Sequence, residues 1–214
     1  MEKINSNIIV RHWPLSAYEP VWAAMRAFTD ARTKDTPDEL WVVQHTPVFT
    51  LGQAGRPEHI LRARDIPVVQ SDRGGQVTYH GPGQLVVYTL VDLERRRLSV
   101  HRLVCQLEQV IINLLGSWGI AAHRKPKAPG VYVDDAKIAA IGLRLRRQCS
   151  YHGFSLNVDM DLDPFNDINP CGYPNQTVTQ LKDLKADCAF SKVIDDCLAA
   201  LQQQLAQFPP TVMT

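Results

Sequence analysis

The densest pattern in the chain is Arg73-Gly74-Gly75-Gln76-Val77-Thr78-Tyr79-His80-Gly81-Pro82-Gly83-Gln84, which continues directly into Leu85-Val86-Val87-Tyr88-Thr89-Leu90-Val91. The second part is almost continuously apolar and predicts a strand that is covered on both faces. The glycines of the first part let the backbone approach a ligand closely and adopt positive φ. The pattern matches neither a Walker A loop nor a dinucleotide-binding glycine motif. Two tight turns around a short strand explain these glycines equally well.

The patterns on either side of this stretch predict both strands and helices. Ser16 and Glu19 form a capping-box pattern before a helix that follows Pro20, Ser99 caps a long helix through Trp118, and a last amphipathic helix covers 191–208. Strands are expected at 8–10, 40–43, 67–69, 76–79, 131–133, 137–145 and 154–158. The polar segment Asp159–Asn175 is expected to be a surface or functional loop. Strands and helices alternate without a regular β-α-β rhythm, so we expect an α+β fold with a mixed sheet and packed helices, in one domain spanning 1–214.

Composition excludes several classes of protein. The chain has 214 residues with 45% hydrophobic and 21% charged residues, which is typical of a globular domain. Its 23 Lys and Arg balance 22 Asp and Glu, so no overall basic excess indicates a nucleic acid or an anionic membrane as partner. The start of the chain does not resemble a secretory signal, and no segment is long enough to span a membrane. With an odd number of cysteines, five, we expect reduced thiols in a cytoplasmic protein.

Two side chains stand out as candidates for covalent chemistry. Cys171 lies between Pro170 and Gly172 in the polar segment, where a thiol can be presented at a bend. A reactive thiolate needs a basic group beside it, and Lys137 enters the apolar strand that follows Asp134-Asp135. A lysine in that place is either partly desolvated, which favours the neutral amine, or simply a solvated turn residue. The other cysteines are expected to be small buried hydrophobes.

Several blocks of the sequence together resemble one enzyme family. The blocks, which follow one another between about residues 40 and 180, are Gln44–Gly52, Arg73–Gln84, Gly130–Tyr132, Lys137–Gly142, His152–Val158 and Ile168–Gly172. In this order they are similar to the octanoyltransferases, or lipoyl(octanoyl) transferases, of the lipoate-protein ligase B type. The resemblance implies the catalytic-domain fold of the biotin and lipoate protein ligases.

The resemblance also implies an activity and its site. The activity is transfer of an octanoyl or lipoyl group from acyl carrier protein to a lysine of a lipoyl domain, the first step of endogenous protein lipoylation. Cys171 would carry the acyl group as a thioester, and Lys137 would be its proton acceptor. The implied substrate-binding residues are Arg73, Gly74, Gly75, Gln76, Val77, Thr78, Tyr79, His80, Ala140, Ile141, Gly142, Gly153, Phe154 and Ser155.

The same resemblance defines the expected partners. The donor is octanoyl-acyl carrier protein, which carries the acyl group on its phosphopantetheine arm. The acceptors are apo lipoyl domains of 2-oxoacid dehydrogenase E2 subunits and the glycine cleavage H protein. No metal and no bound cofactor is expected. Backbone amides near Gly142 or in the Gly74-Gly75 turn are candidates to stabilise the oxyanion. Basic clusters that could dock an acidic carrier are Arg95–Arg97, Arg124 with Lys125 and Lys127, and Arg144 with Arg146 and Arg147.

Four other functions remain open on the sequence. An ATP-dependent lipoate or biotin ligase shares the implied fold and needs no cysteine nucleophile. A non-catalytic module that binds lipoyl domains has no need of Cys171 either. A zinc site made of Cys171, His80 and His152 has a spacing that matches no known closed site. A papain-like protease lacks both flanking motifs of that family here.

Overall fold

The computed structural model describes residues 8–170, 176–185 and 189–210. A seven-stranded sheet has the order β1-β2-β6-β10-β9-β8-β7, in which β1 and β2 are parallel and the other neighbours are antiparallel. These strands are β1 (Ile8–His12), β2 (Asp38–Val43), β6 (Gln84–Leu90), β7 (His123–Lys125), β8 (Ala128–Val133), β9 (Ala136–Arg146) and β10 (Cys149–Asn157). A smaller sheet has the order β4-β3-β5, with β3 (Val48–Leu51), β4 (Val68–Gln70) and β5 (Val77–His80). The predicted α+β fold with a mixed sheet is confirmed.

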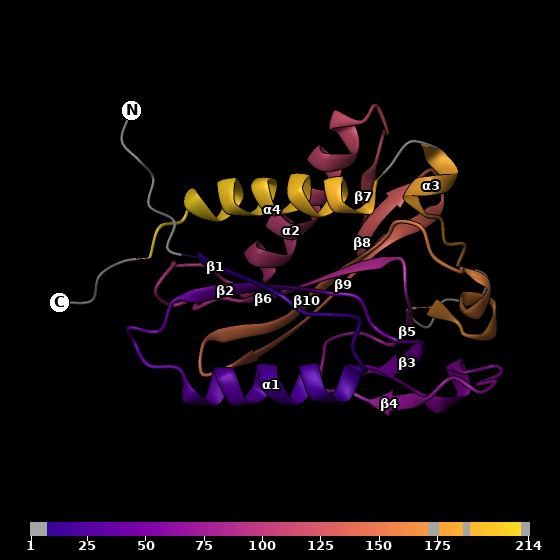
Figure 1. Cartoon of the computed structure of the whole chain (residues 1–214), viewed down its shortest axis with the longest axis horizontal. Helices are drawn as coiled ribbons and strands as arrows, with labels where there is room; N and C mark the ends of the chain where they lie inside the picture. The colour runs from indigo at the N-terminus through magenta and orange to yellow at the C-terminus, as the bar shows by residue number, and fades with distance from the viewer. Residues whose placement is uncertain (1–7, 171–175, 186–188, 211–214) are drawn as a thin grey trace.

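Helices cover both faces of the large sheet (Figure 1). Helix α1 (Tyr18–Ala31) lies on one face, and α2 (Val100–Ser117) and α4 (Phe190–Ala206) lie on the other. The alternation of side chains along a strand supplies both cores: in β6, Val87 packs toward α2 and α4, whereas Val86 and Tyr88 pack toward α1. The prediction that 85–91 is covered on both faces is therefore confirmed. The remaining short elements are η1 (Pro57–His59), η2 (Asp163–Asp167) and α3 (Leu181–Leu184).

The two predicted helix caps have different outcomes. Ser99 caps α2 as expected, because its side chain accepts a hydrogen bond from the Arg102 N–H. The prediction for Ser16 is wrong, because α1 begins at Tyr18 after Ala17 and has no side-chain cap. The backbone of Ser16 instead forms a bridge with the segment at His45, so Ser16 is not placed at the helix start. Within the described ranges, no helix is both long enough and apolar enough to cross a membrane.

The segment expected to be a polar loop is partly a core element. Met160, Phe165 and Ile168 are buried against the small sheet, where Phe49 and Tyr79 are among their neighbours. The expectation of a surface or functional loop is therefore wrong for these three residues, whereas the side chains of Asp159, Asp161, Asp163 and Asn166 are exposed. The reason is that its few apolar side chains all face β3 and β5, a surface that only the tertiary fold creates.

Candidate functional site

A pocket lies between the start of α1, the segment that joins β4 to β5, and strands β6, β9 and β10. Every predicted substrate-binding residue except Tyr79 lines it. The Tyr79 ring faces the other way and packs against Phe49 and Phe165. The structure adds four lining residues that the sequence analysis does not predict for binding, namely Tyr18, Val86, Tyr88 and His152.

Close backbone contact holds the glycine-rich segment on strand β9. The Gly74 N–H donates to the Leu143 carbonyl at 2.9 Å, and a Cβ atom added to Gly142 would lie 2.8 Å from the Gly74 carbonyl oxygen. Gly75 has φ +89°, a conformation that favours glycine. The suggestion that the Gly74 amide stabilises an oxyanion is therefore wrong, because that amide is already donating within the fold.

Arg73 ties the same segment to the small sheet. The residue is 8% exposed, and its guanidinium donates to the carbonyl oxygens of Thr50, Gln76 and Gly74 and to the Thr50 hydroxyl. These bonds fix the backbone on both sides of Gly75. Arg73 is therefore a buried residue that fixes the backbone of the pocket wall.

Two histidines beside the pocket are held in their neutral form. The Gln84 amide nitrogen donates to Asn157, so the Gln84 oxygen accepts from His80 Nδ1 at 2.7 Å. His45 Nδ1 donates to the Ser16 carbonyl, and His45 Nε2 accepts from the Tyr88 hydroxyl at 2.6 Å. Burial lowers the pKa of His80 to about 3 and the pKa of His45 to about 4. Near pH 7 both rings are uncharged.

Asp72, which the sequence did not predict as a site residue, joins the glycine-rich segment to α1 and β10 beside the pocket. Its carboxylate accepts from Trp22 Nε1 at 2.8 Å, from His152 Nε2 at 2.8 Å and from the Tyr151 hydroxyl at 2.5 Å. Burial opposes ionisation of Asp72, but these hydrogen bonds hold its pKa well below the usual range. Burial likewise lowers the pKa of His152, although Asp72 acts against the shift. His152 is therefore neutral, and its Nδ1 atom has no hydrogen-bond partner among the described residues.

Lys137 is buried at the start of β9, with 4% of its surface exposed. Its Nζ donates to the Pro129 carbonyl at 3.1 Å and lies 5.3 Å from the centre of the Tyr132 ring. Its backbone N–H donates to Thr177, and its carbonyl accepts from the Thr179 N–H. The interpretation of Lys137 as a solvated turn residue is therefore wrong.

The neighbourhood of Lys137 connects to the main pocket. Lys137 and Pro170 both line a smaller cavity, and Thr78, Ala140 and Ser155 line this cavity as well as the main pocket. Cys171 follows Pro170 in the chain but lies outside the described residues. The described segments on either side of it, which end at Pro170 and resume at Gln176, both reach the surroundings of Lys137.

The expectation of small buried hydrophobes is confirmed for Cys149 and Cys197 but not for Cys105, and Cys188 lies outside the described residues. Cys197 and Cys149 are buried, and Cys105 is half-buried. Burial raises the pKa of the Cys197 thiol to about 12 and also raises the pKa of Cys149. Both thiols are protonated near neutral pH, so neither is suited to attack a carbonyl. In the parts of the chain that the structure describes, no three His, Cys, Asp or Glu side chains form a group that could hold a metal ion.

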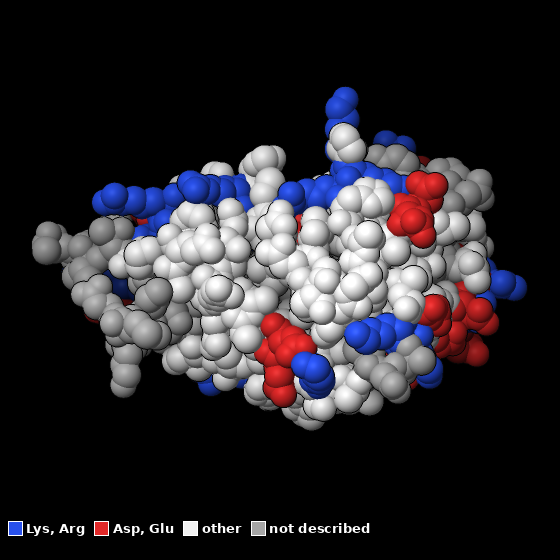
Figure 2. Space-filling view, turned by 90° about the horizontal axis from the view of Figure 1, so that it is seen from above, with Lys and Arg blue, Asp and Glu red and all other residues white. Residues whose placement is uncertain are grey.

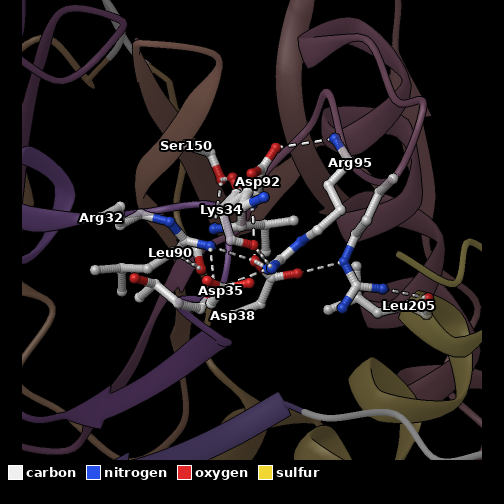
Figure 3. Close-up of polar contacts among 12 residues, drawn as sticks. Arg32, Lys34, Asp35, Asp38, Leu90, Asp92, Arg95, Ser150 and Leu205 are labelled. Carbon is white, nitrogen blue, oxygen red and sulfur yellow. Dashed lines mark hydrogen bonds and ion pairs between the residues drawn. The ribbon is translucent and has the colours of Figure 1, made fainter. Parts of the chain in front are cut away.

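The basic clusters divide into buried and surface groups. Arg96 is 3% exposed and pairs with Asp38, as does Arg95 (Figure 3), so the docking role expected for Arg95–Arg97 is wrong for these two residues. Arg146 pairs with Asp30 at 2.7 Å and stays half-exposed. Figure 2 shows Lys and Arg side chains in a row along one edge of the face that carries α2 and α4, whose middle has few charged side chains.

Comparison with known proteins tests the predicted family. The family model described as "Lipoyl protein ligase A/B catalytic domain" matches residues 17–202. An octanoyltransferase of Chromobacterium violaceum is 56% identical over 92% of this chain and 96% of its own length, and one of Xanthomonas campestris pv. campestris (strain B100) is 57% identical over 92% and 84%. These relatives confirm the predicted family and the acyltransferase class.

Solved structures show the same fold at low sequence identity. A lipoate-protein ligase A bound with ATP superposes with a TM-score of 0.78 at 14% identity, covering 96% of this chain and 89% of the other. A biotin protein ligase from Aquifex aeolicus, solved with biotin and ATP, reaches a TM-score of 0.58 at 15% identity, covering 94% and 71%. The predicted biotin and lipoate ligase fold is confirmed, and the chain belongs to the lipoyl protein ligase A/B catalytic domain family.

Proposed function

We propose that this protein transfers an octanoyl group from a thioester donor to a protein lysine, with Cys171 as the nucleophile and Lys137 as its proton acceptor. The observation that carries the proposal is the burial of Lys137 in a cavity that Pro170 also lines and that shares three residues with the main pocket. Burial of an amine favours its neutral form, which is the form that accepts a proton. The octanoyltransferase relatives supply the identity of the acyl group.

The first half of the reaction loads the enzyme. The Cys171 thiol gives its proton to the Lys137 amine, and the thiolate attacks the carbonyl carbon of the donor thioester. The bond from that carbon to the donor sulfur breaks, and the donor thiolate takes the proton from Lys137. The products are an octanoyl thioester on Cys171 and a carrier thiol.

The second half delivers the acyl group. The neutral amine of the acceptor lysine attacks the enzyme thioester, and Lys137 takes a proton from the new ammonium group. The carbon–sulfur bond breaks, an amide remains on the acceptor, and the Cys171 thiolate recovers the proton from Lys137. Because the donor is already a thioester, the scheme needs no nucleotide to activate the acyl group.

The acyl chain fits along the sheet between the two walls of the pocket. In register across the strands, Val86, Ser155 and Ala140 form one row, and Tyr88, Gly153 and Gly142 form the next. Such rows are about 6.7 Å apart, which is two residues along a strand. The second row contains two glycines because other backbone lies close to it: a Cβ atom would lie 2.8 Å from the Gly74 carbonyl oxygen if added to Gly142, and 1.9 Å from the Val87 carbonyl oxygen if added to Gly153.

Donor and acceptor follow from the chemistry of the site and from the family. The donor is octanoyl-acyl carrier protein, whose phosphopantetheine arm can bring its thioester to Thr78 and Ser155. The acceptors are the lysines of apo lipoyl domains of 2-oxoacid dehydrogenase E2 subunits and of the glycine cleavage H protein. A membrane or a nucleic acid has no part in this scheme.

Intact mass spectrometry of the protein mixed with octanoyl carrier protein, without ATP, tests the proposal. We expect an added octanoyl group that maps to the peptide containing Cys171, and its transfer to a lipoyl domain on addition of the acceptor. Cys171→Ser should abolish the adduct, whereas the matched control Cys105→Ser should retain it. An adduct elsewhere would overturn the proposal, and a strict requirement for ATP would favour a ligase of the type seen in the structural neighbours.

A further inference from the structure

A buried carboxylate of helix α2 bonds to the stretch of backbone that Lys137 contacts. Glu108 is on α2, is 6% exposed, and accepts a hydrogen bond from the Gly130 N–H at 3.0 Å through Oε1. Its other oxygen pairs with Arg124 Nε at 2.9 Å. Burying a carboxylate is costly unless it is paired in this way, and the other buried residues of α2 are all leucine, isoleucine or valine. The helix therefore keeps a charged group where an apolar side chain would pack.

The backbone that Glu108 holds is the backbone on which Lys137 rests. Gly130 has φ +135°, and a Cβ atom on it would lie 3.0 Å from Lys137 Cε and 2.6 Å from the Ala139 carbonyl oxygen. The residue before it, Pro129, provides the carbonyl that accepts from Lys137 Nζ. The pairing of β8 with β9 is irregular just beyond, between Val131 and Tyr132. The regular hydrogen bonds between β8 and β9 are therefore not the only interactions that fix this backbone.

We propose that Glu108 is a positioning residue for Lys137, and this inference rests on the proposed function. By holding the Gly130 N–H, the Glu108 carboxylate fixes the peptide that presents the Pro129 carbonyl. That carbonyl in turn directs the Lys137 amine toward the cavity shared with Pro170. Glu108 does not touch the substrate, so it acts on the rate of the proton transfer and not on binding of the donor.

Three substitutions of Glu108 separate the effect of side-chain length from the effect of charge. Glu108→Gln keeps an oxygen at the same distance from Gly130, Glu108→Asp keeps the charge but is one methylene shorter, and Glu108→Ala removes both. The rate of Cys171 acylation by octanoyl carrier protein is measured in single turnovers across pH, together with KM and with unfolding in urea. Gln109→Ala is the matched control, because it changes the next residue of α2, which bonds to Asn113 and Arg124, and leaves the bond from Gly130 to Glu108.

We expect Glu108→Gln and Gln109→Ala to acylate within a few-fold of the unchanged protein. Glu108→Ala and Glu108→Asp should be slower by about 10-fold to 100-fold, with unchanged KM and an altered pH profile. A slow Glu108→Gln beside a fast Glu108→Asp would assign the effect to charge and overturn the proposal. Loss of stability with an unchanged rate and pH profile would also overturn it. If the unchanged protein forms no adduct on Cys171, the proposed function fails first.

Discussion

Two clusters of buried polar groups in this protein are satisfied in opposite ways. In the arginine cluster (Arg32, Arg95, Arg96 and Asp38; Figure 3), permanent charges neutralise one another. In the imidazole cluster (His45, His80 and His152), burial keeps titratable rings neutral beside the pocket. An apolar acyl chain can lie against neutral rings without stripping water from a charge. The arginine cluster therefore lies away from the pocket and depends on charge, whereas the three histidines at or beside the pocket are neutral.

Asp38 is the centre of the arginine cluster. Its oxygens accept from Arg32 and Arg96 at 2.6 and 2.5 Å, from Arg95 at 2.9 Å, and from the Asp92 N–H. Burial alone would raise the pKa of Asp38, but the arginines, above all Arg96, lower it below the usual value. The carboxylate is therefore charged near neutral pH.

The largest effect is expected for Asp38→Ala, which leaves three arginines buried without their common partner. We expect the free energy of unfolding in urea to fall by about 3–5 kcal/mol. Molecules that remain folded should transfer the acyl group at the normal rate, because the cluster does not touch the pocket. Asp35→Ala is the control at an exposed carboxylate nearby and should change stability little. A normal stability for Asp38→Ala would remove the distinction between the two clusters.

The second prediction concerns the free energy of unfolding at acidic pH, to which the arginine cluster and the imidazole cluster contribute differently. An unfolded histidine has a pKa near 6.5, while His45 and His80 have folded pKa values of about 4 and about 3. Between these limits the unfolded chain binds more protons, so the free energy of unfolding falls as pH drops below 6.5. The slope is up to about 1.4 kcal/mol per pH unit for each ring. Asp38 adds little above about pH 5, because its carboxylate is ionised there in both the folded and the unfolded chain; its contribution is lost only as pH falls through the unfolded value of 3.8.

Urea unfolding at pH 7, 6 and 5 measures this slope. His80→Gln should flatten it by about one proton, since one neutral ring is gone. His12→Gln at an exposed position is the control and should leave the slope unchanged. An identical slope in all three proteins would show that His80 is not held neutral by the fold.

A smaller loss of stability is expected for Tyr88→Phe. The Tyr88 hydroxyl is the donor to His45 Nε2, and without it that buried nitrogen has no partner. We expect a loss of about 1–2 kcal/mol in the free energy of unfolding. The phenylalanine ring keeps the wall of the pocket, so octanoyl transfer should persist. An unchanged stability would show that the histidine finds another donor and that the imidazole cluster is less tightly specified than the arginine cluster.

Much of the fold could be predicted from sequence because both faces of the central strands are covered. Continuous apolar runs such as 85–91 predict buried strands, and the turn at Asp134, whose φ is +48°, suits an aspartate between β8 and β9. Ser16 and the buried residues of the segment 159–170 were not predicted correctly. Their conformations depend on residues far away in the chain, at His45 and in β3, and local patterns carry no information about such contacts.

The sequence predicted which segments meet at the pocket, but it did not predict the buried polar residues that hold those segments in place. The glycine-rich segment and the blocks at 140–142 and 153–155 do line one pocket, and their role in binding substrate stays a prediction. Asp72 was missed although it immediately precedes Arg73, because one carboxylate beside a glycine motif does not reveal its three donors. Glu108 had a clearer signal: it lies three and seven residues before Ile111 and Leu115, on the apolar stripe of α2.

The smallest effect on stability is expected where charges lie at the surface. The pair between Arg146 and Asp30 is half-exposed on both sides, and such pairs contribute about 0–1 kcal/mol. Arg144→Glu combined with Arg146→Glu should therefore leave the urea midpoint almost unchanged, unlike Asp38→Ala. If this edge of β9 docks an acidic carrier, the same variant should raise KM for octanoyl carrier protein and weaken its dependence on salt. An unchanged KM would show that these arginines do not dock the carrier. The charges that matter for this protein would then all be at buried positions.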